Sequence, residues 1–64
     1  MTAKEFVKSV YPISKSEKFY YNKSKVNRSF IVIWNGENRI GFGETSLEAW
    51  KDARRNILKV KKIN

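Results

Sequence analysis

Apolar residues near the start of the chain recur with the spacing of an amphipathic helix. They occupy positions i, i+3, i+4, i+7 and i+8, at Ala3, Phe6, Val7, Val10 and Tyr11. Thr2 and Glu5 have capping-box spacing, which begins a helix by satisfying its first backbone N–H groups. Pro12 has no backbone N–H and disfavours helix in the residue before it, so it ends the segment. The pattern predicts a short N-terminal helix that needs packing against the rest of the protein to persist.

A second helical pattern occupies the C-terminal part of the chain. Thr45 and Glu48 repeat the capping-box spacing, and we expect helix over residues 46–61. The apolar residues of this segment fall within an arc of about 100°, the width of a core-facing stripe. They are Ala49, Trp50, Ala53, Ile57 and Val60. The spacing therefore predicts a long helix with one face in the core.

Between the helices the pattern changes to short runs of β-branched and aromatic residues, which are typical of strands. The predicted strands are residues 19–21, 29–34 and 39–43, and the polar stretches 13–18 and 22–28 are predicted to be loops. Asn35-Gly36 indicates a tight hairpin between the last two strands, because both residues tolerate positive φ. We therefore expect one α+β domain over residues 1–64, with a three-stranded antiparallel sheet between a short and a long helix.

The second predicted strand carries apolar side chains on both faces. By alternation, Phe30, Val32 and Trp34 point to one side of the sheet, and Ile31 and Ile33 to the other. In the next strand, Gly41 and Gly43 share one side, where missing side chains either let a helix approach closely or leave a shallow apolar groove. A second apolar face around Ile31, Ile33 and Gly41 would be a candidate surface for a protein partner or a homodimer.

Composition restricts the function more than it restricts the fold. The 64 residues include 14 Lys and Arg against 6 Asp and Glu, which gives a formal net charge of +8 at pH 7. Cys and His are absent, which removes thiol chemistry, the commonest metal ligand and the usual general base. We therefore expect no enzyme activity, no cofactor and no metal site. The positive charge favours an acidic partner, either nucleic acid or an acidic protein or nucleoprotein complex.

The basic residues fall into two candidate binding groups. The first lies on the predicted C-terminal helix and comprises Lys51, Arg54, Arg55, Lys59 and Lys62. Such a group can follow phosphates, but a solvated outer helix face has the same composition. The second lies near the aromatic residues 19–21 and comprises Lys15, Lys18, Lys23, Lys25 and Arg28. It can combine phosphate contacts with base stacking, or it can protect an edge strand from association.

The carboxylates near the long helix favour a structural interpretation. Glu44, Glu48 and Asp52 recur every four residues around its predicted start, where the helix dipole favours acidic side chains. A divalent cation needs more oxygen ligands that converge in a cleft. The segment Gly41-Phe42-Gly43 lacks the third glycine of a dinucleotide-binding motif.

The junction between the last strand and the long helix, residues 40–53, resembles two known families. A strand ending in Gly-x-Gly, followed by Thr-x-x-Glu-Ala-x-x-x-Ala on a helix, is similar to the double-stranded-RNA-binding domain and to the HicB-type antitoxin domain. The first resemblance implies the same α-β-β-β-α order, but not the RNA contacts, because Glu44 and Glu48 stand where that family places lysines. The second covers only the second half of the chain and carries over no partner-binding residues. The chain as a whole looks most like short uncharacterised phage-encoded proteins.

These observations support two functional hypotheses. In the first, the chain is a small non-catalytic phage-type accessory protein that binds nucleic acid, or a host complex that handles nucleic acid. The resemblance implies host takeover or counter-defence in the cytoplasm of an infected bacterium. In the second, it is a protein–protein interaction or inhibitor module, or a homo-oligomer, that uses the apolar sheet face. The apolar run 30–34 is far too short to cross a bilayer, so we expect no membrane association.

Overall fold

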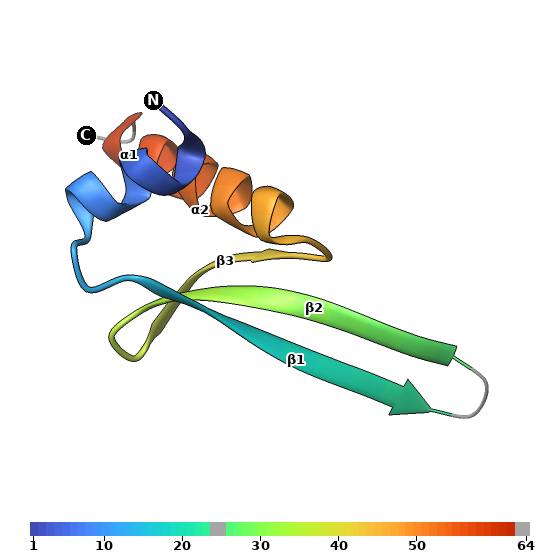
Figure 1. Cartoon of the computed structure of the whole chain (residues 1–64). Helices are drawn as coiled ribbons and strands as arrows, with labels where there is room; N and C mark the ends of the chain where they lie inside the picture. Colours follow the sequence, from blue (N-terminus) through green and yellow to red (C-terminus); the bar gives the residue numbers. More distant parts are fainter. Residues whose placement is uncertain (24–25, 63–64) are drawn as a thin grey trace.

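The computed structural model describes residues 1–23 and 26–62 of the chain. The elements are helix α1 (Ala3–Val10), strands β1 (Lys15–Lys23), β2 (Val26–Asn35) and β3 (Asn38–Gly43), and helix α2 (Ser46–Lys62). The strands form one antiparallel sheet in the order β1-β2-β3. Both helices lie on the same side of the sheet, which gives the protein two layers (Figure 1). The predicted α+β arrangement is confirmed.

The first two strands are longer than the sequence predicted. Residues 15–18, predicted as loop, belong to β1, and the ladder runs from Lys15↔Trp34 to Lys23↔Val26. The loop prediction is also wrong for residues 22–23 and 26–28, which extend the same two strands. The β-branched and aromatic residues of β2 favour a long strand. The polar residues 15–18 then pair with this strand through their backbone. As an edge strand, β1 tolerates Lys and Ser because much of it faces water.

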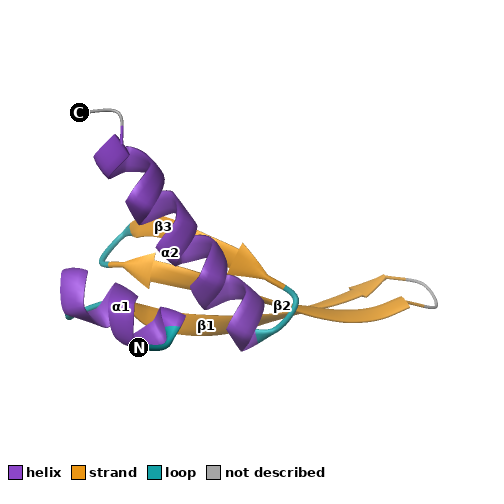
Figure 2. Cartoon of the chain, turned by 90° about the horizontal axis from the view of Figure 1, so that it is seen from above, coloured by secondary structure: helices purple, strands orange, loops and turns teal. Residues whose placement is uncertain are grey.

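The far part of the β1–β2 pair projects from the body of the protein as a two-stranded ribbon. Figure 2 shows it extending well beyond both helices. The molecule accordingly measures 44 × 24 × 22 Å along its principal axes. Phe19 and Phe30, which are register partners in this ribbon, stack with ring centroids 5.3 Å apart and an interplanar angle of 15°. A cross-strand aromatic pair of this kind contributes roughly 0.5–1 kcal/mol and so helps to hold the strands together where no helix covers them.

The core lies between the helix layer and one face of the sheet. Its buried residues are Ala3, Val7, Ile31, Ile33, Ala49, Trp50, Ala53 and Ile57. Apart from Val60, whose side chain is outside the described part, the whole predicted stripe of the C-terminal helix is buried here. The helical period of the sequence therefore identifies the inner face of α2 correctly.

α2 lies directly on β3, and two glycines permit this. A Cβ atom at Gly41 would lie 2.6 Å from the backbone oxygen of Ala49 and 2.7 Å from the Cβ of Ala53. A Cβ atom at Gly43 would lie 2.5 Å from the backbone nitrogen of Ala49. Of the two interpretations of these glycines, close approach of a helix is confirmed and an open groove on this face is wrong.

A β-bulge lets β3 add one more side chain to the core. Ile33 pairs with Gly41 and Trp34 pairs with Arg39, so Ile40 has no register partner in β2. A bulge interrupts the alternation of side chains along a strand, and Ile40 accordingly packs against the core. The predicted hairpin between β2 and β3 is confirmed, with Gly36 at the left-handed φ of 64°. Its turn residues are Gly36 and Glu37, because Asn35 still pairs with Asn38.

α1 begins with the predicted capping box. The backbone N–H of Glu5 donates to Thr2 Oγ1 at 3.1 Å, and the backbone N–H of Thr2 donates to Glu5 Oε1 at 2.9 Å. The hydrogen bonds from the backbone and the side chain of Thr2 lower the pKa of the Glu5 carboxyl from its ordinary value, because they stabilise its charged form. The stability of the start of α1 therefore depends on the charged form of one exposed carboxylate, that of Glu5.

α1 is held in place mainly by α2. Ala3 and Val7 are buried in the same core as Trp50. The Nζ atoms of Lys4 and Lys8 each lie 5.9 Å from the centroid of the Trp50 ring, within the range of cation–π attraction. These contacts supply the packing that a helix of eight residues requires.

We predict that Gly41→Ala lowers the free energy of unfolding by about 1–3 kcal/mol, because the added methyl group overlaps the α2 backbone. The midpoint of urea-induced unfolding measures the change. Gly36→Asn is the control, since asparagine tolerates a positive φ and the nearest heavy atom to a Cβ there is 3.8 Å away. An unchanged midpoint for Gly41→Ala would contradict the close contact between α2 and β3.

We also predict that acidification removes the stabilisation given by the Glu5 carboxylate. Because folding lowers the pKa of this group, its contribution is complete above the unfolded-state pKa and is lost as the pH falls through the lower folded-state pKa. In Glu5→Gln the side chain still accepts a hydrogen bond but does not titrate. The difference in free energy of unfolding between the two proteins should therefore shrink between about pH 6 and pH 3. A difference that stays constant over this range would refute the assignment.

Candidate nucleic-acid interface

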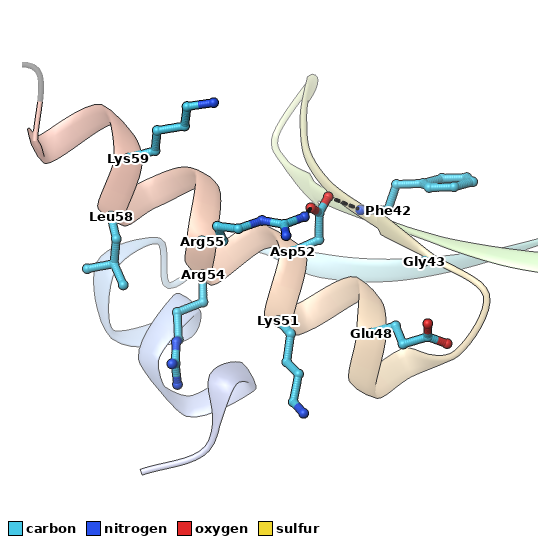
Figure 3. A pocket seen from close by; sticks show the side chains of 9 residues that line it. All are labelled: Phe42, Gly43, Glu48, Lys51, Asp52, Arg54, Arg55, Leu58 and Lys59. Atoms are coloured by element: carbon cyan, nitrogen blue, oxygen red, sulfur yellow. Dashed lines mark hydrogen bonds and ion pairs between the residues drawn. The ribbon is translucent and has the colours of Figure 1, made fainter.

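The basic residues of α2 lie on the outer surface of the protein. Lys51, Arg54, Arg55 and Lys59 are exposed. Figure 3 shows Lys51 and Arg54 pointing to one side of the helix and Lys59 to the other. Lys62 belongs to the last turn of α2, and its side chain is outside the described part. The helix thus presents positive charge over a broad arc rather than along one straight row.

An open groove between α2 and the end of β3 contains both signs of charge (Figure 3). Phe42 contributes to one wall, and the other includes the basic side chains together with Glu48 and Asp52. Oδ1 of Asp52 accepts a hydrogen bond from Nη2 of Arg55 at 2.5 Å, in an ion pair within one helical turn. This pair reduces the positive charge that α2 offers to a phosphate, so the groove is a poorer anion site than its lysines suggest.

The second basic group lies on strands and is divided between the two faces of the sheet. Lys15 pairs in register with Trp34 and Lys18 with Ile31, so the two lysines point to opposite sides. Arg28 is exposed on β2 and shares the face of Lys15. Lys23 ends β1, and its side chain is outside the described part, whereas Lys25 lies wholly outside the described residues. The structure therefore does not unite these five residues in one patch.

The sheet face away from the helices carries a row of three phenylalanines, one from each strand. Phe30 lies between the other two, with ring centroids 5.3 Å from Phe19 and 5.3 Å from Phe42. Val32, on the same face, is only 4% exposed, whereas Phe42 is 50% exposed. This aromatic face consists of Phe19, Phe30, Val32 and Phe42, and it is the apolar surface that the sheet leaves uncovered.

The residues predicted for a protein interface are on the other face. Ile31 is 9% exposed and Ile33 is fully buried, both in the core beneath the helices. Gly41 is covered by the backbone of α2. These three residues are therefore not available to a partner, because the close approach of α2 turns their side of the sheet inward.

Sequence reasoning missed the aromatic face because it left open which side the helices cover. The deciding signal was present in Gly41 and Gly43, since the strand side that lacks side chains is the one that a helix can approach closely. Once that side is inside, alternation places Phe42 and its cross-strand neighbours Val32 and Phe30 outside.

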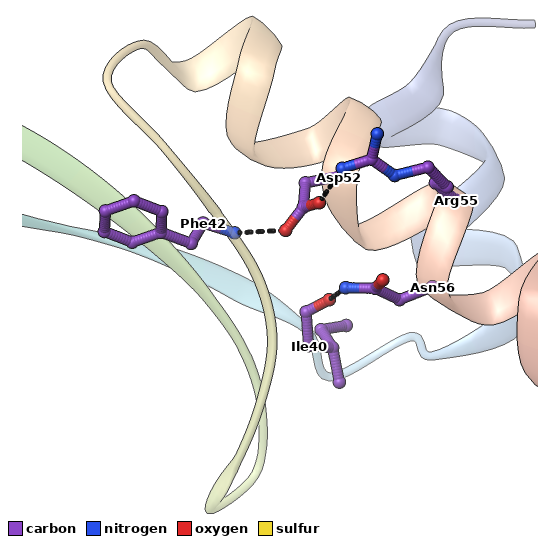
Figure 4. A network of polar contacts seen from close by, with 5 residues as sticks. All are labelled: Ile40, Phe42, Asp52, Arg55 and Asn56. Atoms are coloured by element: carbon purple, nitrogen blue, oxygen red, sulfur yellow. Dashed lines mark hydrogen bonds and ion pairs between the residues drawn. The ribbon is translucent and has the colours of Figure 1, made fainter.

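Two polar side chains of α2 close the outer edge of β3. Oδ2 of Asp52 accepts the backbone N–H of Phe42 at 3.0 Å, and Nδ2 of Asn56 donates to the backbone oxygen of Ile40 at 2.9 Å. Figure 4 shows both contacts on one side of β3 and the ring of Phe42 on the other. The side chains replace the neighbouring strand that an edge would otherwise recruit, and they fix the position of Phe42.

The acidic residues near α2 have structural roles. The backbone N–H of Glu48 donates to Thr45 Oγ1 at 3.2 Å, and Oε1 of Glu48 accepts from the same hydroxyl at 3.1 Å. Thr45 therefore caps α2 as its spacing predicted, although the carboxylate bonds to the Thr45 hydroxyl rather than to the Thr45 backbone. Among the described residues, no three His, Cys, Asp or Glu side chains gather as metal ligands would.

We predict that Asp52→Ala combined with Asn56→Ala makes the protein self-associate. Both edge contacts are lost, and the freed N–H and C=O groups of β3 can pair with another chain. Sedimentation velocity over a range of concentrations should show species larger than those of the unchanged protein. Arg54→Ala with Leu47→Ala serves as the control, because these exposed side chains of α2 leave the β3 edge closed. Equal sedimentation of the edge variant and the unchanged protein would show that the contacts do not protect the edge.

Comparison with known proteins adds no family to this picture. No protein family, no curated protein and no solved structure matches the chain. Within residues 1–23 and 26–62, neither helix has the length and apolar character needed to cross a bilayer. The resemblances to the double-stranded-RNA-binding domain, to the HicB-type domain and to short phage proteins stay predictions.

Proposed function

We propose that this chain is a small non-catalytic protein that binds nucleic acid, alone or within a nucleoprotein complex, through its positive surfaces. We propose further that it is an accessory protein of the phage type, acting on host nucleic-acid systems in takeover or counter-defence. The observation that supports binding is the exposure of the basic residues. Every Lys and Arg side chain that the structure describes is exposed, and among them only Arg55 forms an ion pair with a carboxylate.

Exposed and unpaired cations favour phosphate contacts for a physical reason. A lysine or arginine that already lies in water loses little hydration when it approaches a phosphate at the protein surface. Each neutralised phosphate also releases counterions condensed on the nucleic acid, which favours binding at low salt. A formal charge of +8 on 64 residues provides several such contacts at once.

The two layers divide this charge into separate surfaces. The cations of α2 lie on the helix side, whereas Lys15, Arg28 and Arg39 lie on the sheet side, where Arg39 is the register partner of Trp34. The molecule is 22–24 Å across its shorter axes, and the Debye length is about 8 Å at physiological salt. A ligand on one side is therefore largely screened from the charges on the other.

We predict that the protein binds nucleic acid with a steep dependence on salt. If three or four phosphates are neutralised, affinity should fall roughly 20- to 150-fold between 50 and 200 mM salt. Fluorescence anisotropy with labelled duplex and single-stranded oligonucleotides measures this directly. Heparin, a polyanion without bases, is the control for attraction by charge alone. Absence of salt-sensitive binding to any oligonucleotide, or equal binding to heparin, would overturn the proposal.

A further inference from the structure

The aromatic face has the features of a ligand surface rather than of an exposed core. Its three phenylalanines follow one another across β1, β2 and β3, with both ring spacings at 5.3 Å. Val32, on the same face, is only 4% exposed, and the exposed apolar area is concentrated on Phe42, which is half exposed. Phe42 is the most exposed of the three, and an exposed aromatic ring offers a flat surface on which a planar group stacks.

Three basic side chains lie on the same face, one beyond the rings towards the ribbon and two beyond them in the other direction. Arg28 lies two residues from Phe30, a distance of roughly 7 Å along the strand, and Lys15 pairs with Trp34 at the other end of β2. Arg39 lies across from Trp34 on β3. All three are exposed, and Glu17, the partner of Val32, is the one acidic residue that the described register places among them. The face thus combines planar apolar surface with a net positive border.

The combination of rings and cations identifies the ligand chemistry. Flat rings bordered by cations fit a polyanion that carries exposed planar bases, and each base that stacks on an aromatic side chain strengthens binding. In a duplex the bases are stacked on one another and cannot reach the rings. In a symmetric dimer through this face, the cations of one copy would approach those of the other, and each chain already carries +8.

We propose that the aromatic face binds single-stranded nucleic acid, with bases stacked on Phe42 and on the Phe19–Phe30 pair and phosphates contacted by Arg28, Arg39 and Lys15. This inference rests on the proposed function and specifies its ligand and its site. Stacking and phosphate contact do not involve the sugar, so ribose and deoxyribose strands bind alike. The basic surface of α2, which lies on the opposite layer, is not required.

The test compares single-stranded oligothymidylate, single-stranded oligouridylate and a duplex of the same length, using fluorescence anisotropy and the full chain. Both single strands should bind more tightly than the duplex. Phe42→Ala should weaken single-strand binding about 5- to 150-fold, the range for loss of one stacked base. Phe42→Tyr should retain binding, because it keeps the aromatic ring.

Two matched controls locate the site. Tyr20 is 78% exposed on the opposite face of the ribbon, so Tyr20→Ala should leave affinity unchanged. Arg28→Glu with Arg39→Glu changes the net charge by four units, as does Lys51→Glu with Lys59→Glu on α2. The first pair should reduce affinity at least tenfold more than the second. Phe42→Leu is a second variant that removes the ring but keeps apolar volume, and it should also weaken binding. Circular dichroism checks that each variant is folded.

The results distinguish failure of this inference alone from failure of the proposed function. If the duplex binds best and the α2 pair of substitutions is the more damaging, the inference is overturned and the proposed function stands. The inference also fails if folded Phe42→Ala and Phe42→Leu bind as tightly as the unchanged protein. If no nucleic acid binds, both proposals fail. In that case, light scattering that shows a dimer lost in Phe42→Ala would identify the face as a self-interface.

Discussion

The architecture of this protein depends on the close approach of α2 to β3. Gly41 and Gly43 have no side chains, so the backbone of the helix lies directly against the strand. This contact decides which side of the sheet is covered. Ile31 and Ile33, on the side of the glycines, become core, and the alternate positions of β2 are turned outward. One steric condition therefore sets both the interior of the protein and the composition of its free sheet face.

The two edges of the sheet are protected in different ways. The edge of β3 is closed by Asp52 and Asn56 of α2, which bond to its backbone. In the described part of the chain, no helix side chain bonds to the backbone of β1, which carries Lys15 and Lys18, whose charge opposes pairing with another strand. Part of the positive charge therefore has a structural use. Exposed charge alone therefore does not identify a binding surface. The position of the aromatic rings distinguishes one face of the sheet from the other charged surfaces.

The helices and the β2–β3 hairpin could be predicted from sequence because their signals are local. Caps at Thr2 and Thr45, a helical period and a glycine that turns the hairpin each act within a few residues, and the structure contains all of them, although the turn is Gly36-Glu37 rather than Asn35-Gly36. The full length of β1 could not, since its Lys- and Ser-rich beginning pairs only because β2 lies beside it. The register shift that adds Ile40 to the core and the edge contact of Asn56 also depend on tertiary packing. The candidate basic residues were recognisable, but their division between two layers was not.

The two helices cover one face of the sheet and leave the other free (Figure 1). α1 and α2, with 8 and 17 residues, are about 12 and 25 Å long, and both are used on one side. An antiparallel sheet usually presents polar residues on its free face. Here that face is aromatic, and the rings limit the cost of exposure by stacking on one another above a buried Val32. The part of the inner sheet face beneath the helices is built instead from Ile31, Ile33 and two glycines. The aromatic composition of the free face and the cations on it are the features from which we infer a charged, planar ligand.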